Sequence, residues 1–290
     1  MGQLDSDAQE SQARHVLEYP ATRLVIAVVW IGGLLFALTT LHIKPASLFE
    51  VAGAVVIAAA YVLYVRVIER RPIRELAWRG APAEFGAGFL LGAALFTVTI
   101  GIIWALGDYA IVGVNPWTAM LVPLGFAISA GVLEEILFRG VIFRITEEWL
   151  GSWGALAVSS LLFGAAHMAN PHATLTSALA IALEAGVLLG AAYMITRRLW
   201  LPIGLHAAWN FTQSGVFVAP VSGMTTHGLF VAKLSGPAWA TGGAFGPEAS
   251  LPALLVAMSG VGLVIYVART GRLVQPIWRR GAQDSIMPAL

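Results

Sequence analysis

Long apolar stretches separated by short polar segments dominate the chain. A helix needs about 20 apolar residues to cross a bilayer. On that criterion the pattern predicts about eight transmembrane helices, roughly Leu24–Leu41, Leu48–Val67, Phe85–Leu106, Trp117–Phe138, Trp153–Met168, Leu175–Ile195, Leu201–Val218 and Leu251–Val267. The fourth stretch is expected to continue as helix through Arg144 towards Trp149. The predicted fold class is therefore all-α: a polytopic membrane helical bundle.

Composition supports the same class. The 290 residues are 58% hydrophobic and 11% charged, with a mean hydropathy of +0.78, whereas a soluble domain carries about 25% charged residues. We therefore expect the lipid bilayer to be a partner of this chain. The net charge of +1 argues against nucleic acid as a partner, and the absence of cysteine excludes a thiol nucleophile and a disulfide framework.

Basic residues predict the orientation in the membrane. Arginines concentrate in alternate connections, whereas the opposite set holds only Lys44 and Lys233. The positive-inside rule then places both termini in the cytoplasm of a multi-pass cell-membrane protein. The expected organisation is a polar tail at 1–22, one transmembrane domain at 23–270 with its functional core at about 117–218, and a second cytoplasmic tail at 271–290.

Charged residues interrupt the fourth apolar stretch at Glu134-Glu135-Ile136-Leu137-Phe138-Arg139. Charges inside a bilayer are costly unless they are paired or hydrated. Glu135 and Arg139 are four residues apart, with the acid first, so they can pair along one helix face. Glu134 lies about 100° round the helix and lacks that partner. A carboxylate that is held but not neutralised is a candidate general base.

Two further polar patterns interrupt later apolar stretches. Phe163 and His167 share one helix face, and so do His206 and Asn210. Counted in residues from the same membrane side, Glu134, His167 and His206 lie at similar depths, around the middle or inner half of the bilayer. They are predicted to meet in one buried polar site, although a lone His or Asn in a membrane helix more often makes an interhelical hydrogen bond than takes part in catalysis.

Two features have open interpretations. Glu184 is another acid within an apolar stretch; it either lines the same cavity or pairs with Arg139. The Gly- and Pro-rich connection from Ala219 to Ser250 is expected outside the membrane, as an irregular connection, a cover for the outer face or a contact for substrate.

The motifs Glu-Glu-x-x-x-Arg (134–139), Phe-x-x-x-His (163–167) and His-x-x-x-Asn (206–210), in that order, resemble those of the CAAX protease and bacteriocin-processing family. The resemblance covers about Pro123 to Phe211. It implies an eight-helix intramembrane endopeptidase acting on a membrane-associated peptide or protein. Eukaryotic members cleave prenylated proteins, whereas bacterial members are tied to peptide maturation or bacteriocin immunity. Whether the substrate of this chain is lipidated stays open.

The residues suggest a mechanism for such a protease. Glu134 is expected to activate a water that His167 orients, while His206 and Asn210 stabilise the oxyanion, and Glu135 and Arg139 support Glu134. No cofactor is favoured. The alternatives are a zinc-dependent version with Glu134, His167 and His206 as ligands, a non-catalytic immunity or scaffold protein, and a transporter.

Overall fold

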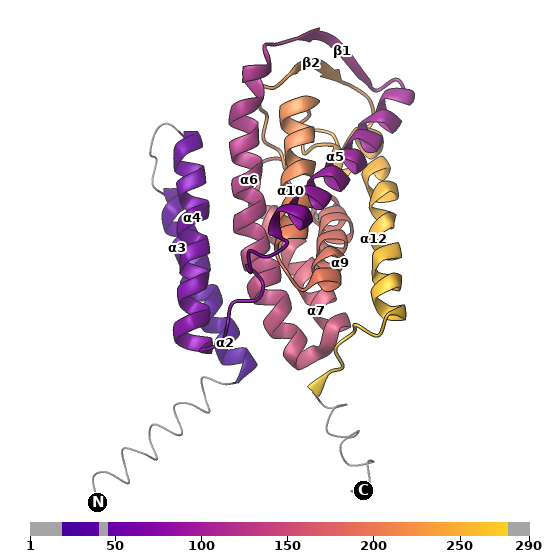
Figure 1. Cartoon of the computed structure of the whole chain (residues 1–290). Helices are drawn as coiled ribbons and strands as arrows, with labels where there is room; N and C mark the ends of the chain where they lie inside the picture. The colour runs from indigo at the N-terminus through magenta and orange to yellow at the C-terminus, as the bar shows by residue number, and fades with distance from the viewer. Residues whose placement is uncertain (1–18, 41–45, 278–290) are drawn as a thin grey trace, which may run out of the picture.

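The apolar stretches fold as helices. The computed structural model describes residues 19–40 and 46–277. In Figure 1 a two-stranded sheet caps one end of the helical bundle, and the described chain begins and ends at the other. The N-terminal side contains α2 (Pro20–Ala27), η1 (Val28–Gly32), α3 (Gly33–Thr40), α4 (Ala46–Tyr64), η2 (Val65–Glu69) and α5 (Ala81–Ala105). The η elements are π-helices or 3₁₀-helices.

The remainder of the chain builds the centre of the bundle and its far side. It contains β1 (Tyr109–Val114), η3 (Trp117–Met120), α6 (Leu121–Glu135), η4 (Ile136–Phe143), α7 (Arg144–Ala166), η5 (His167–Ala169), α8 (Leu175–Ile181), η6 (Ala182–Gly186), α9 (Val187–Thr196), α10 (Trp200–Phe211), η7 (Thr212–Val216), β2 (Phe230–Leu234), α11 (Ala238–Thr241), η8 (Pro247–Ala249) and α12 (Leu251–Arg269).

The number of membrane crossings depends on one bend. Six described segments are long and apolar enough to span a bilayer, and one of them, Trp117–Ala169, has 53 residues. This segment reverses at Gly151, whose φ of 72° is accessible mainly to glycine. After the bend the ring of Phe163 packs edge-on against Phe138, with centroids 4.9 Å apart. The helical membrane bundle is therefore confirmed, and the exact count of eight stays a prediction.

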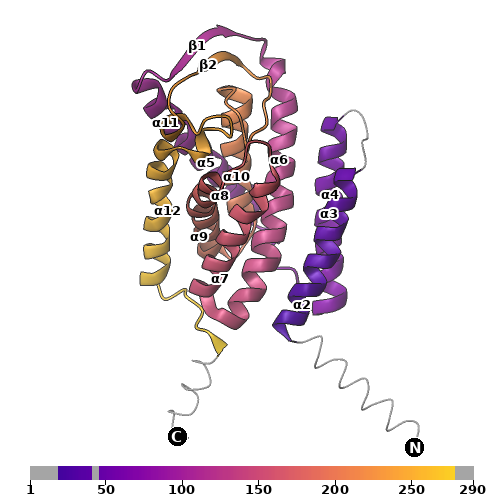
Figure 2. The ribbon, with the colours of Figure 1, turned by 180° about the vertical axis from the view of Figure 1, so that it is seen from behind.

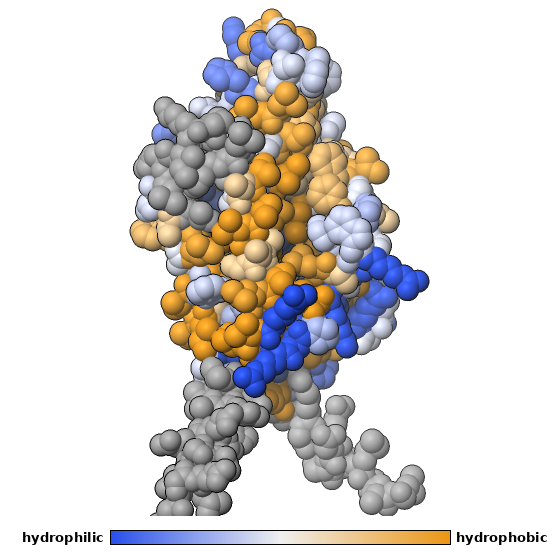
Figure 3. Space-filling view, turned by 60° about the vertical axis from the view of Figure 1, so that its left-hand side comes forward, coloured by the Kyte–Doolittle hydropathy of each residue, from blue (hydrophilic) through white to orange (hydrophobic). Residues whose placement is uncertain are grey.

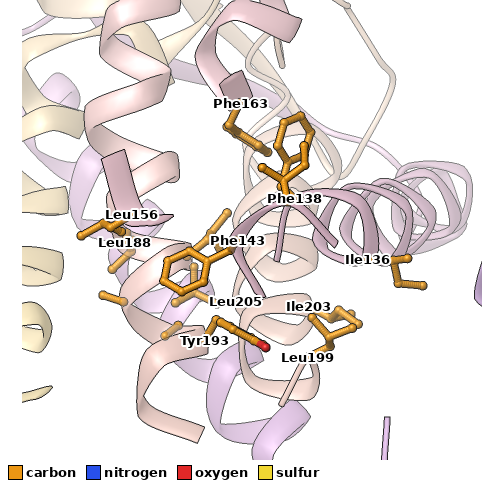
Figure 4. Packing of buried hydrophobic residues seen from close by; sticks show 14 of the residues in the cluster. Ile136, Phe138, Phe143, Leu156, Phe163, Leu188, Tyr193, Leu199, Ile203 and Leu205 are labelled. Atoms are coloured by element: carbon orange, nitrogen blue, oxygen red, sulfur yellow. The ribbon is translucent and has the colours of Figure 1, made fainter. Parts of the chain in front are cut away.

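Helix α10 occupies the centre of the bundle, packed by α5, α6 and α9 (Figures 1 and 2). All eight residues from Pro202 to Trp209 are buried. Figure 4 shows part of the surrounding apolar core, where α10 and its neighbours contribute Ile136, Phe138, Phe143, Leu156, Phe163, Leu188, Tyr193, Leu199, Ile203 and Leu205. Any polar group on the inner face of α10 is consequently shielded from lipid.

Small residues bring the neighbouring helices close to α10. A Cβ atom on Gly88 would lie 2.2 Å from the Leu201 carbonyl oxygen, and one on Gly92 would lie 2.2 Å from that of Leu205. On the other side, Gly131 of α6 rests against the backbone of α10 near Ile203. The Gly88-x-x-x-Gly92 spacing thus lets α5 approach α10 closely.

The outer connections form structure that the hydropathy pattern did not predict. β1 and β2 pair antiparallel, with Tyr109 opposite Leu234 and Val114 opposite Phe230. Figures 1 and 2 show this small sheet above the end of α10. Part of the connection from 219 to 250 is therefore an ordered cover, which was one of the three interpretations of that segment.

The hydrophobic surface of the bundle, and the charged residues at the end opposite the sheet, are typical of a protein embedded in lipid. Figure 3 shows hydrophobic residues over most of one face, with strongly hydrophilic residues towards its ends. At the end opposite the sheet, Arg144 donates to Glu69 at 2.6 Å, and Arg197 pairs with Glu147. Arginines from separate connections thus lie on one side, as predicted, whereas the predicted tails fall mostly outside the described residues.

Replacing Gly92 by alanine should destabilise the protein by about 1–3 kcal/mol, because its Cβ would overlap the backbone of α10. Gly101 of the same helix is the matched control, since a Cβ there meets nothing within 4 Å. Thermal unfolding of the two purified variants in detergent measures the difference. Equal melting temperatures for Gly92→Ala and Gly101→Ala would contradict this account of the α5–α10 contact.

Candidate active site

A cavity of about 250 Å³ lies inside the bundle, and polar groups from several helices line it. Glu134 enters from the end of α6, His167 from the turn that follows α7, and His206 and Asn210 from α10. The structure therefore brings these four residues to one pocket, together with Glu184 from η6.

Glu134 faces both imidazole rings. Its Oε2 atom lies 4.0 Å from Nε2 of His167 and 3.9 Å from Nε2 of His206. The same oxygen is buried and has no hydrogen-bond partner among the described residues. The side chain as a whole is 28% exposed, so it is less enclosed than its neighbours. Glu134 is thus positioned by its helix and is not neutralised by an arginine.

Glu135 and Arg139 form the predicted pair. Nη1 of Arg139 donates to Oε1 of Glu135 at 2.9 Å, and both side chains have no exposure. Nη2 of Arg139 donates to the carbonyl oxygens of Ala185 and Gly186, each at 3.2 Å. The guanidinium also lies over the Phe163 ring, 4.7 Å from its centroid. The arginine therefore joins α6 to η6 and to α7.

His206 bonds to the same carboxylate, a contact that the sequence gave no reason to expect. Its Nδ1 atom donates to Oε1 of Glu135 at 2.9 Å. Glu135 was predicted to support Glu134, but among the described residues its side chain bonds to Arg139 and His206. Its direct effect is thus to fix the ring of His206, with Nε2 turned towards Glu134.

His167 is held in a comparable way by its own helix. Its Nδ1 atom lies 2.8 Å from the Phe163 carbonyl oxygen, which only accepts hydrogen bonds, so Nδ1 carries the proton. The ring also packs on Phe163, with centroids 4.7 Å apart. Both histidines therefore use Nδ1 for orientation and present Nε2 to Glu134, an arrangement common in histidines that do chemistry or bind metal.

Asn210 and Glu184 complete the predicted set. Asn210 lines the cavity one turn beyond His206. Glu184 lines it as well and is only 1% exposed, whereas Arg139 bonds to the carbonyls beside Glu184 and to Glu135. Of the two interpretations of Glu184, the structure supports the cavity.

The outer connection also lines the cavity, which no pattern in the sequence indicated. Val221, Ser222, Met224 and Glu248 all line the cavity, although they lie in the segment expected outside the membrane. Glu248 is 3% exposed, and burial raises the pKa of its carboxyl to about 7. No periodic pattern surrounds Glu248 in the sequence, so its isolation in a weakly charged connection was the one available signal.

The cavity contains side chains of the types that bind zinc. Two imidazole nitrogens and a carboxylate are acceptable zinc ligands, but ligand atoms in a tetrahedral zinc site lie roughly 3.3 Å apart. The separations from Glu134 to the two histidines are 4.0 and 3.9 Å. Within residues 19–40 and 46–277 no three His, Cys, Asp or Glu residues are grouped closely enough to hold a metal ion. Glu134 thus lies somewhat farther from each imidazole than two ligands of one tetrahedral zinc ion lie from each other.

Comparisons with known proteins agree with the motifs. A family described as "Type II CAAX prenyl endopeptidase Rce1-like" matches residues 113–212, which contain all three motifs. The "Putative membrane peptidase YdiL" of Bacillus subtilis (strain 168) is 26% identical over 179 residues, covering 57% of this chain and 69% of that protein. The resemblance to the CAAX protease and bacteriocin-processing family is thus confirmed. Together with six apolar helices, it supports a multi-pass membrane protein of the endopeptidase class.

Arg139→Met should destabilise the protein by about 3–5 kcal/mol, because Glu135 would keep a buried charge without its guanidinium. The double variant with Glu135→Gln should recover part of the loss, since it removes that charge. Arg74→Met, at an exposed arginine, is the control. Denaturation in detergent measures all three, and an Arg139→Met protein as stable as the control would refute this account of the network.

Proposed function

We propose that this chain is an intramembrane endopeptidase that hydrolyses a peptide bond in a membrane-associated peptide or protein. One observation carries the proposal: the unpaired Oε2 of Glu134 faces Nε2 of both His167 and His206 in one cavity of the bundle. This is the arrangement of a general base beside two groups that bind oxygen atoms.

The separations suit a water molecule as the nucleophile. Two hydrogen bonds of about 2.8 Å that meet at one oxygen at roughly a right angle span about 4 Å. The distance from Glu134 Oε2 to His167 Nε2 is 4.0 Å. We infer that a water binds between them, with His167 accepting one of its hydrogens. Glu134 removes the other proton as the water oxygen attacks the carbonyl carbon.

The attack converts the carbonyl oxygen to an oxyanion, which His206 and Asn210 are placed to stabilise. Donation from Nε2 of His206 requires protons on both ring nitrogens, and the Glu135 carboxylate beside Nδ1 favours that form. The Asn210 amide supplies a second donor from the next turn of α10. Buried donors aimed at a developing charge commonly contribute the largest catalytic effect.

The reaction ends when the tetrahedral intermediate collapses. The C–N bond breaks, and Glu134 returns its proton to the departing nitrogen, so that one product gains a carboxyl group and the other an amine. Glu134 thereby acts first as base and then as acid, and no other proton carrier is needed. This scheme uses no metal, which is consistent with the wide separation of the three groups.

We also propose that both termini lie in the cytoplasm, because the paired arginines lie at the end where the described chain begins and ends. A substrate anchored in the bilayer, with or without an attached lipid, would then reach the cavity from within the membrane. A non-catalytic immunity or scaffold role would not require an unpaired base facing two oriented histidines.

Glu134→Gln, His167→Ala and His206→Ala should each lower kcat at least 10²-fold, because each removes the base or an oxygen-binding group. The controls are His172→Ala and Glu84→Gln. Neither residue lines the cavity, and His172 is exposed. Mass spectrometry of peptides accumulating in cells that express each variant would reveal the client and the loss of cleavage together. Wild-type turnover in any of the first three variants would remove that residue from the mechanism. If the Glu134→Gln variant fully restores cells that lack this protein, the non-catalytic role is favoured.

Protein purified without chelator should contain no stoichiometric zinc and should keep its activity in EDTA. Elemental mass spectrometry and the same cleavage assay measure both quantities. Near-stoichiometric zinc that is lost together with activity would replace the metal-free scheme by one in which Glu134, His167 and His206 are ligands.

A further inference from the structure

The cavity contains a second pair of acids that the hydrolytic scheme does not use. Glu184 comes from η6 and Glu248 from η8, and both line the cavity. The two residues are 64 positions apart in sequence. They come to the same cavity because η8 packs against α8, which leads directly into η6.

One carboxyl oxygen of Glu184 is buried without a hydrogen-bond partner among the described residues. Its side chain is 1% exposed, and its Oε2 atom has no hydrogen bond to any described residue. A carboxyl group in such a place normally bonds to a neighbouring helix, because an unsatisfied buried polar group costs about 1–3 kcal/mol. An acid that holds helices together would show such a bond, so Glu184 is available to a ligand in the cavity.

Glu248, in contrast, is held firmly in position. Its Oε1 atom accepts hydrogen bonds from the backbone N–H of Ser222 and, at 2.9 Å, from the Ser222 hydroxyl. Its Oε2 atom accepts one from the amide of Gln213, which also donates to the Pro220 carbonyl oxygen. These bonds fasten the outer connection to η7. They also hold the carboxyl group of Glu248 in a fixed position at the cavity wall.

The charges that line the cavity do not balance. Among the described residues, three glutamates line it, Glu134, Glu184 and Glu248, whereas no lysine or arginine does and the protonated His206 supplies a single positive charge. Arg139 is fully buried against Glu135 and two backbone carbonyls. The remaining wall near Glu184 is apolar and includes Ile181, Leu188 and Leu189. Apolar walls that end at carboxylates suit the methylene stem and charged head of a basic side chain.

We propose that Glu184 and Glu248 form a subsite that binds the cationic side chain of a lysine or arginine in the peptide substrate. The inference rests on the proposed endopeptidase activity and adds a substrate class to it. Binding of the cation neutralises the two acids and places the peptide at a fixed distance from Glu134. A basic residue at one defined position relative to the cleaved bond is the expected specificity.

The test uses the full chain reconstituted in liposomes and a library of synthetic membrane-partitioning peptides with varied sequence. Mass spectrometry of the products should show lysine or arginine enriched at one fixed position from the cut. A matched pair of peptides, with lysine or norleucine at that position, then gives the ratio of their KM values. We expect a KM at least 10-fold lower for the lysine peptide with the wild-type protein.

Glu184→Gln and Glu248→Gln should each bring that ratio close to one, whereas Glu84→Gln should leave it unchanged, because Glu84 pairs with Arg198 away from the cavity. Measuring both peptides on each variant cancels any general loss of folded protein. Cleavage without a positional preference, or a preference that survives both substitutions, would overturn the subsite and leave the protease intact. If no peptide is cleaved, the proposed function fails, and the subsite falls with it.

A second measurement needs only the wild-type protein. Burial raises the pKa of Glu248 to about 7. Gln213 and Ser222 donate hydrogen bonds to it, and the other titratable groups that line the same cavity are Glu134, Glu184, His167 and His206. The preference for lysine over norleucine should therefore grow between pH 6 and pH 8, as this carboxyl loses its proton. Any pH effect on the hydrolytic step is common to both peptides, so a constant ratio across this range would also count against the subsite.

Discussion

The buried bonds of Glu135 determine the geometry of the whole site. A carboxylate with no solvent exposure needs partners of positive or donating character, and Arg139 and His206 supply them at 2.9 Å each. Since Arg139 also bonds to η6 and lies over Phe163 of α7, this one cluster links α6, α7, η6 and α10. Neighbouring Glu134 stays unpaired because the available guanidinium already serves Glu135. Two adjacent acids of identical chemistry thus acquire different environments.

Close backbone packing lets these side chains meet. Gly131 precedes Glu134 by about one turn and rests on α10, while Gly164 precedes His167 by about one turn and lies against the Ala178 carbonyl of α8. Larger residues at these points would separate the helices by more than the reach of the hydrogen bonds. The π-helical segments η4 and η6 add to this adjustment. They contain Arg139 and Glu184, and π-helical turns commonly occur at functional sites.

The outer connection changes the character of the cavity. Without it, the polar groups from the helices would form a pocket with one free acid for catalysis and another at Glu184. The bonds of Glu248 to Ser222 and Gln213 bring a third carboxylate to the wall and fasten the cover over α10. The same connection supplies β2, which pairs with β1 and gives the backbone outside the helices its hydrogen bonds. One segment, the connection from 219 to 250, therefore both covers the site and adds a carboxyl group to it.

The amino-acid sequence by itself determined the features that depend on neighbours within one helix. Hydropathy identified the helices, the four-residue spacing identified the Glu135–Arg139 pair, and the three motifs indicated the resemblance to the family whose model matches residues 113–212. Tertiary structure alone decided the contacts between distant segments: Glu135 with His206, the strand pairing, and the position of Glu248. The physical reason is that helical periodicity relates residues three or four apart, whereas bonds between elements depend on how the helices pack and where a connection returns. A glutamate in an irregular connection carries no periodic signal, so only the folded chain places it in the cavity.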